Sequence, residues 1–171
     1  INNFLYFNNL ASAVQFNNPI DYFHLFVKKE WLITDRFKLS QNIHFQKVKY
    51  NANVNFDIIP VPLIFLNQKI EYNFLLFKKI EFSSSIDVTF HSKYYANSYM
   101  PLNGVFYNQD DLKIGGKPFL KGAFFMKKKN FKIGVLIENI HSLFFDEMYI
   151  NPSYMHNDLI FRFYIDWKFL D

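Results

Sequence analysis

Apolar and polar side chains alternate with a period of two along most of the chain. In the clearest stretch, residues 159–169, every odd position is large and apolar, while Arg162, Asp166 and Lys168 stand at even positions. Successive side chains of a β-strand point to opposite faces, whereas on a helix these charges would surround the axis. The pattern therefore predicts a strand with one apolar and one polar face.

The same alternation recurs upstream and predicts about eight strands. They are expected at residues 2–13, 20–33, 36–50, 61–77, 80–96, 117–127, 131–141 and 157–170. The alternation is weakest over the first of them, and the two faces of the sixth are less distinct than the others. Several exceed the five or six residues common in soluble sheets, and a tilted strand needs about 9–11 residues to cross a bilayer. The lengths favour strands that cross a membrane.

Short and long connections alternate along the chain. Tight turns are predicted at residues 34–35, 78–79 and 128–130, and long loops rich in Asn, Pro, Gly and Tyr at 52–60, 97–116 and 142–156. In an up-and-down meander every second connection falls at the same end of the sheet. One rim should therefore hold the short turns and the other the long loops, as in transmembrane barrels with short periplasmic turns. We expect both termini at the short-turn rim, facing the periplasm.

These features predict an all-β fold, an antiparallel up-and-down transmembrane β-barrel, with residues 1–171 forming a single barrel domain or part of one; the resemblance described below implies the carboxy-terminal part. Alternation alone does not say which face is inside, because soluble barrels turn the apolar face inward and membrane barrels turn it outward. Strand length, loop asymmetry and the rings near strand ends favour the membrane arrangement. If the strands at 2–13 and 157–170 do not pair, the chain is an open arc of a larger barrel.

This arrangement assigns a side to each strand residue. The residues expected to face the lumen are Lys69, Glu71, Glu81, Asp87, His91, Lys93, Lys132, Glu138, Arg162, Asp166 and Lys168. Those expected to face lipid or an interfacial girdle are Phe82, Phe90, Tyr94, Phe131, Phe161, Phe163, Trp167 and Phe169. The charged groups either set a field inside the lumen or pair with one another across strands.

Composition agrees with half-buried strands and offers little chemistry. Aromatic residues make up 21% of the chain, a heavy load for a soluble domain, and the net charge of +4 is spread mainly over lysines in turns. No cysteine is present, which excludes disulfides and thiol chemistry. No apolar run approaches the roughly 18–20 residues of a membrane-spanning helix.

No motif predicts an enzyme, a cofactor or a metal site. The five histidines have no metal-ligand spacing and are expected to be pore or loop residues. Ser85, Asp87 and His91 share a strand face, but neighbours on one face are about 6–7 Å apart, too far for direct hydrogen bonds. Rings and lysines mostly occupy opposite faces, which argues against nucleic-acid binding.

Four stretches in the second half of the sequence are similar to those of a known family: residues 89–101, 104–109 (GVFYNQ), 114–119 (IGGKPF) and the last strand, 162–169. Together they resemble the carboxy-terminal region of the Bacteroidota "putative porin" family. The resemblance extends over about 60–171 and is looser over 20–50. One departure is that Leu170 and Asp171 follow Phe169, where outer-membrane strands often end on the aromatic residue.

The resemblance implies an outer-membrane β-barrel inserted by the barrel-assembly machinery, with passive transport. Family members are longer than this chain, so these strands would be the last portion of the barrel. We therefore expect porin-like passive diffusion of small polar solutes in the bacterial outer membrane, with outer-membrane lipids around the wall. The alternatives are a soluble, lipocalin-like barrel that binds an apolar ligand, and a plugged outer-membrane barrel with an anchoring role.

Overall fold

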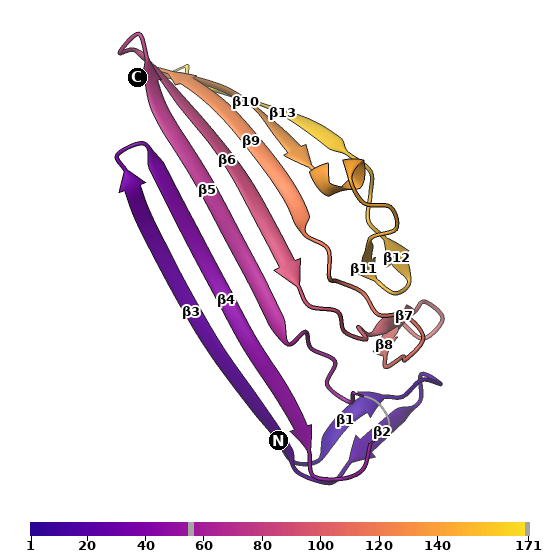
Figure 1. The fold of residues 1–171 in the computed structure, drawn as a ribbon. Helices are drawn as coiled ribbons and strands as arrows, with labels where there is room; N and C mark the ends of the chain where they lie inside the picture. The colour runs from indigo at the N-terminus through magenta and orange to yellow at the C-terminus, as the bar shows by residue number, and fades with distance from the viewer. Residues whose placement is uncertain (55–56, 170–171) are drawn as a thin grey trace.

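Seven long strands form one antiparallel sheet in the computed structural model, which describes residues 1–54 and 57–169 (Figure 1). These strands are β3 (Ile20–Thr34), β4 (Phe37–Tyr50), β5 (Ile64–Leu76), β6 (Ile80–His91), β9 (Phe119–Lys128), β10 (Phe131–Glu138) and β13 (Ile160–Trp167). Each pairs with the next long strand along the chain, so the sheet is an up-and-down meander. The predicted all-β, antiparallel fold is confirmed.

The register gives the sheet two chemically different faces. Residues directly opposite each other on paired strands share a face, and one apolar row can be followed across all seven strands. It consists of Trp31, Leu39, Ile70, Ile86, Gly122, Ile137 and Phe161. The adjacent row contains Glu30, Ser40, Lys69, Asp87 and Lys121. We call the two sides the apolar face and the polar face.

Three short hairpins and a 3₁₀ helix lie at one end of the sheet, the loop rim, and the tight turns lie at the other end, the turn rim (Figure 1). The hairpins pair β1 (Phe4–Phe7) with β2 (Ala13–Phe16), β7 (Ser98–Met100) with β8 (Val105–Tyr107), and β11 (Tyr149–Asn151) with β12 (Tyr154–Met155). The helix is η1 (Ile140–Leu143). The predicted separation of short turns from long loops is confirmed for the described residues.

The side chains that are fully buried belong to the loop rim rather than to a core beneath the sheet. Ile58, Ile114 and Met148 are buried there, in three different loops. Asn108 joins two of these loops, because its side-chain amide donates to the carbonyls of Asp57 and Ile58 at 2.9 and 3.1 Å. The long loops are thus packed against one another.

The predicted strand over residues 2–13 is wrong, because this segment turns back on itself as the β1–β2 hairpin. The side chain of Asn8 accepts hydrogen bonds from the backbone of Leu10 and Ser12, both at 3.0 Å, and Ala11 adopts a positive φ of 53°. Both features are typical of a tight turn. Because this segment does not cross the sheet, Ile1 lies at the loop rim, where it exchanges backbone hydrogen bonds with Ile20.

The expectation that both termini lie at the turn rim is therefore wrong for Ile1. The other end of the described chain does reach the turn rim, where Lys168 N–H donates to the carbonyl of Asn130 at 2.9 Å. Leu170 and Asp171, the last of the residues predicted for the final strand and its tail, lie outside the described residues, as do residues 55–56 of the first long loop.

The strand predicted over residues 80–96 ends earlier, at His91, because a distant loop returns to its end. Gly116 N–H donates to the His91 carbonyl at 2.8 Å, and Tyr94 forms an isolated bridge with Ile114. Gly115 has a φ of +96°, and a Cβ there would lie 2.3 Å from the His91 ring. Only glycine allows this close approach, so the backbone of Tyr94 pairs with the returning loop instead of extending the sheet.

The described sheet is open. β3 and β13 are its two edges, and each pairs with one neighbour, β4 and β10 respectively. Apart from Ile20, the whole of β3 is exposed. The described strands therefore form an arc. No helix within the described residues is long and apolar enough to cross a membrane.

Candidate functional site: the polar face and its pocket at the loop rim

The apolar face carries large side chains that the described chain leaves uncovered. Phe163 is 81% exposed and Ile165 is 72% exposed, and no apolar-face residue of the seven long strands is buried. Isolated exposed apolar residues are ordinary, but a continuous surface across seven strands marks contact with a membrane or another macromolecule.

Most residues predicted to face lipid or an interfacial girdle lie on the apolar face. Phe82, Phe90, Phe131, Phe161, Phe163 and Trp167 lie on the apolar face. Phe169 follows the end of β13 and stacks on Trp167, with ring centroids 4.6 Å apart. Tyr94 instead lies beyond β6, in the bridge with Ile114.

The residues predicted to face a lumen share the opposite face. Lys69, Glu71, Glu81, Asp87, His91, Lys132, Glu138, Arg162 and Asp166 all lie on the polar face by register. Lys93 and Lys168 lie just beyond the ends of their strands, and the Lys93 side chain runs over Gly116. Along residues 43–50 of β4 the polar-face positions are half-buried and the apolar-face positions exposed, so the polar face is the more enclosed of the two.

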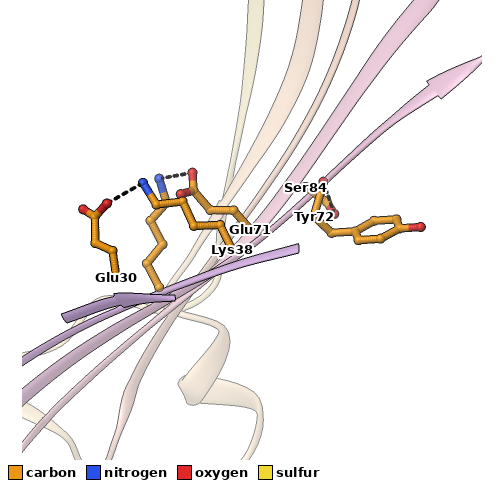
Figure 2. A network of polar contacts seen from close by, with 6 residues as sticks. Glu30, Lys38, Glu71, Tyr72 and Ser84 are labelled. Carbon is orange, nitrogen blue, oxygen red and sulfur yellow. Dashed lines mark hydrogen bonds and ion pairs between the residues drawn. The ribbon is translucent and has the colours of Figure 1, made fainter. Parts of the chain in front are cut away.

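Many charges on the polar face pair with one another. Ion pairs join Glu30 to Lys38 at 3.0 Å, Lys69 to Glu71 at 2.8 Å, Glu81 to Lys127 at 3.2 Å and Glu138 to Arg162 at 2.8 Å. Figure 2 shows Glu30, Lys38 and Glu71 close together on this face, whereas Ser84 and Tyr72 meet on the other side of the sheet. All four pairs are solvent-accessible, so each contributes little stability.

Two polar-face lysines have different surroundings. The ammonium of Lys132 lies over the Phe125 ring, 4.3 Å from its centroid. Lys121 forms no ion pair with any of the described residues, although Asp87 is its register partner across the β6–β9 boundary. Lys121 is therefore available to a ligand.

A pocket of about 390 Å³ opens where the polar face meets the loop rim. Its residues come from four long strands and the loop between β10 and β13. They are Thr89, His91, Phe119, Lys121, Glu138, Asn139, His141, Ile150, His156, Asn157, Ile160 and Arg162. This size suits a small molecule.

Phe119 is the centre of a cluster of rings in this pocket. His141 and His156 pack on it with centroids at 5.1 and 4.8 Å, and His91 stacks on it at 5.6 Å. His141 is 1% exposed, and its Nδ1 accepts the backbone N–H of Leu120 at 3.2 Å. Because Nδ1 accepts, the proton of the neutral ring is assigned to Nε2.

The rings of the two loop histidines favour the neutral state. Burial lowers the pKa of His141. Burial also lowers the pKa of His156, and the nearby positive charges of protonated His141 and Lys121 lower it further. Nε2 of His141 and Nδ1 of His156 have no hydrogen-bond partner among the described residues. The cluster thus presents neutral rings rather than cations.

The remaining two histidines also lie on the polar face. His24 Nε2 lies 3.0 Å from His44 Nδ1, and the His44 ring contacts Phe26 and Phe65. The five histidines, expected to be pore or loop residues, thus each contact another ring. One neighbour of His91 could be derived from the sequence. Residues at equal distances from a tight turn face each other in a hairpin, and Phe65 and His91 lie at equal distances from Lys78, so they are register partners. The described residues hold no group of three or more side chains that could bind a metal.

A family model described as a putative porin matches residues 1–171. No curated protein and no solved structure matches the chain.

Proposed function

The chain belongs to the putative porin family, and on this premise we propose that its sheet is part of the wall of a bacterial outer-membrane β-barrel that lets small polar solutes diffuse passively. The observation that carries the proposal is the pair of contrasting faces. The exposed apolar face suits the outer-membrane lipids, and the more enclosed polar face suits a water-filled lumen. The role needs no catalysis.

Two groups of rings on the apolar face support this orientation. Near the turn rim lie Trp31, Phe37, Tyr72, Phe131 and Trp167, and near the loop rim lie Phe23, Phe45 and Phe90. Membrane barrels carry aromatic girdles at both interfaces, because amphipathic rings sit at headgroup level. Trp31 fits this setting, since its indole N–H donates to Gln41 at 3.3 Å and Lys29 lies over its ring.

The open edges indicate that this sheet is an arc of a larger barrel. Unpaired backbone groups along β3 and β13 would be costly in lipid, so only closed barrels are stable there. We therefore propose that further strands pair with both edges, with the barrel-assembly machinery closing the wall. The turn rim would face the periplasm and the loop rim the exterior.

A soluble, lipocalin-like barrel is less well supported. Such a barrel covers its apolar face by turning it inward, whereas here that face is exposed and the polar face is the more enclosed.

Extraction followed by planar-bilayer conductance tests the proposal. We expect the intact protein to need detergent for a monodisperse state and to give stepwise, ohmic currents in a bilayer. A protein that stays monodisperse without detergent would refute the membrane assignment. A protein that inserts and gives no current would replace the pore with a plugged, anchoring barrel.

A further inference from the structure

We propose that the pocket at the loop rim is a binding site for a small organic acid, an anion with one carboxylate and an apolar or aromatic body. The inference rests on the proposed pore. It names the class of solute that would bind at the loop rim, the proposed outer end of the lumen. It concerns a built pocket with its own charge and its own ring cluster, however, so binding can be measured without any current.

The charged groups of the pocket favour an anion. Its lining holds two cations, Lys121 and Arg162, and one carboxylate, Glu138. Arg162 forms an ion pair with Glu138, its Nε lying 2.8 Å from Oε2, and the two terminal nitrogens of that guanidinium form no hydrogen bond or ion pair among the described residues. A planar guanidinium with free donors matches the geometry of a carboxylate, and Lys121 adds a second, unpaired charge.

Two further acids lie near the pocket but outside its lining. Asp87 is the register partner of Lys121, and Asp158 follows Asn157 of the lining. Neither forms an ion pair with Lys121 or Arg162 in the described part of the chain. Both cations therefore keep donors free for a ligand, and the lining itself carries two positive charges and one negative charge.

The rest of the wall suits an apolar or aromatic body. Phe119, Ile150 and Ile160 supply apolar surface, and the neutral rings of His141 and His156 supply further flat faces. A hydrated inorganic ion would leave this surface unused. An organic acid of modest size would place its carboxylate on the cations and its body on Phe119, and the volume of about 390 Å³ accommodates it.

Isothermal titration of the intact protein in detergent tests the site, with benzoate as the probe. Benzamide has the same shape without the charge, and benzylamine reverses the charge. We expect benzoate to bind and benzamide and benzylamine to bind at least ~10-fold more weakly, the usual scale for hydrogen bonds to charged groups. Inorganic phosphate should not compete at equal concentration. Equal binding of benzamide, or full competition by phosphate, would overturn the assignment.

The variant Lys121→Gln removes the unpaired cation without breaking any ion pair. We expect it to weaken benzoate binding by ~10-fold. The matched control is Lys28→Gln, because Lys28 also lies on the polar face and forms no ion pair among the described residues, but it is not part of the pocket. Circular dichroism checks that both variants fold. Equal benzoate affinity in the wild type and Lys121→Gln would refute the site.

Conductance of the same samples separates this inference from the pore. Currents together with Lys121-independent benzoate binding would overturn the site and leave the pore standing. Lys121-dependent binding without any current would overturn the pore and leave an anion-binding protein. Currents that benzoate reduces in the wild type, and less in Lys121→Gln, would support both.

Discussion

The imidazole rings of His141 and His156 meet edge to face with their centroids 4.8 Å apart, and both pack on Phe119 of β9. His141 belongs to η1, while His156 follows β12, so this contact fastens both ends of one loop to the sheet. Both rings are half-buried or buried, and both have lowered pKa values. The contact is therefore sensitive to protonation.

Acidification should loosen this loop. The pKa values of both histidines are lower in the folded loop than the ordinary imidazole value of 6.5, so the unfolded loop takes up protons more readily. The two neutral rings therefore stabilise the folded loop fully above pH 6.5, and this stabilisation is lost as the pH falls below that value. The groups around the rings are His91 on β6, Lys121 on β9, Glu138 on β10 and Arg162 on β13. Of these groups only the carboxylate of Glu138 would favour protonated histidine rings, and its charge is already paired with that of Arg162.

Hydrogen exchange of residues 139–157 at pH 7.5 and pH 5.5 measures this effect. We expect lower protection factors at the lower pH, once the rates are corrected for the pH dependence of intrinsic amide exchange, and a smaller difference in His156→Gln, which removes one titrating ring. His24→Gln is the control, since His24 lies far from this loop along the sheet. Protection factors that do not change with pH would contradict the prediction.

Gly134 on β10 should not tolerate a side chain, because the ring of Phe125 covers it. A Cβ at this position would lie 2.2 Å from the Phe125 ring and 2.6 Å from the Phe124 carbonyl oxygen. Gly134→Ala should lower the unfolding free energy by about 1–3 kcal/mol, the scale of overpacking. Gly122→Ala is the matched control, because the closest atom to its Cβ would be the flexible end of Ile140 at 3.1 Å, and the next contacts, at 3.9 and 4.0 Å, are ordinary van der Waals distances. Urea unfolding in detergent compares them, and equal stability losses would refute this account.

The long strands and their faces could be predicted from sequence, because period-two alternation specifies both. Of the eleven residues assigned to the lumen, nine lie on the polar face by register, as Arg162 and Asp166 of β13 do. The other two, Lys93 and Lys168, follow the ends of β6 and β13. The turn at Asn8 was missed because short apolar runs flank it, and alternation does not reveal whether a segment crosses the sheet or folds back. Asn108 and the pair of His141 and His156 depend on contacts between loops, which leave no local pattern.

A charge at the centre of the apolar face should impair assembly, whereas the same charge one residue away should not. Ile86 lies mid-strand on the apolar face, and Ser85 lies beside it on the polar face opposite Glu71. Ile86→Lys should cost about 2–4 kcal/mol in a bilayer and reduce the fraction of folded barrel. Ser85→Lys should assemble normally. Heat-modifiable electrophoretic mobility reports the folded fraction, and equal assembly of both variants would contradict a lipid-facing surface.

Cysteine pairs can test whether the two edges meet, and the chain has no native cysteine to interfere. Disulfides need Cα atoms within about 7 Å of each other. Lys132→Cys with Asp166→Cys joins register partners on β10 and β13 and should cross-link. Lys28→Cys with Tyr164→Cys joins the edges β3 and β13 and should not. Cross-linking of the second pair in the intact protein would mean that these strands close a barrel by themselves.

The two tryptophans provide the most direct test of which face meets lipid. Trp31 and Trp167 are the only tryptophans of the chain, both lie on the apolar face, and both stand near the turn rim. Lipids brominated near the headgroup should quench their fluorescence more strongly than lipids brominated at the chain ends, because the rings belong to an interfacial girdle. The control replaces both with Phe and introduces Tyr164→Trp on the polar face, about 10 Å along β13 from Trp167 and on the other side of the wall. This tryptophan should be quenched by aqueous acrylamide and hardly by brominated lipid. Equal lipid quenching in the wild type and the control would mean that both faces contact lipid, and the assignment of an aqueous side to the sheet would fail.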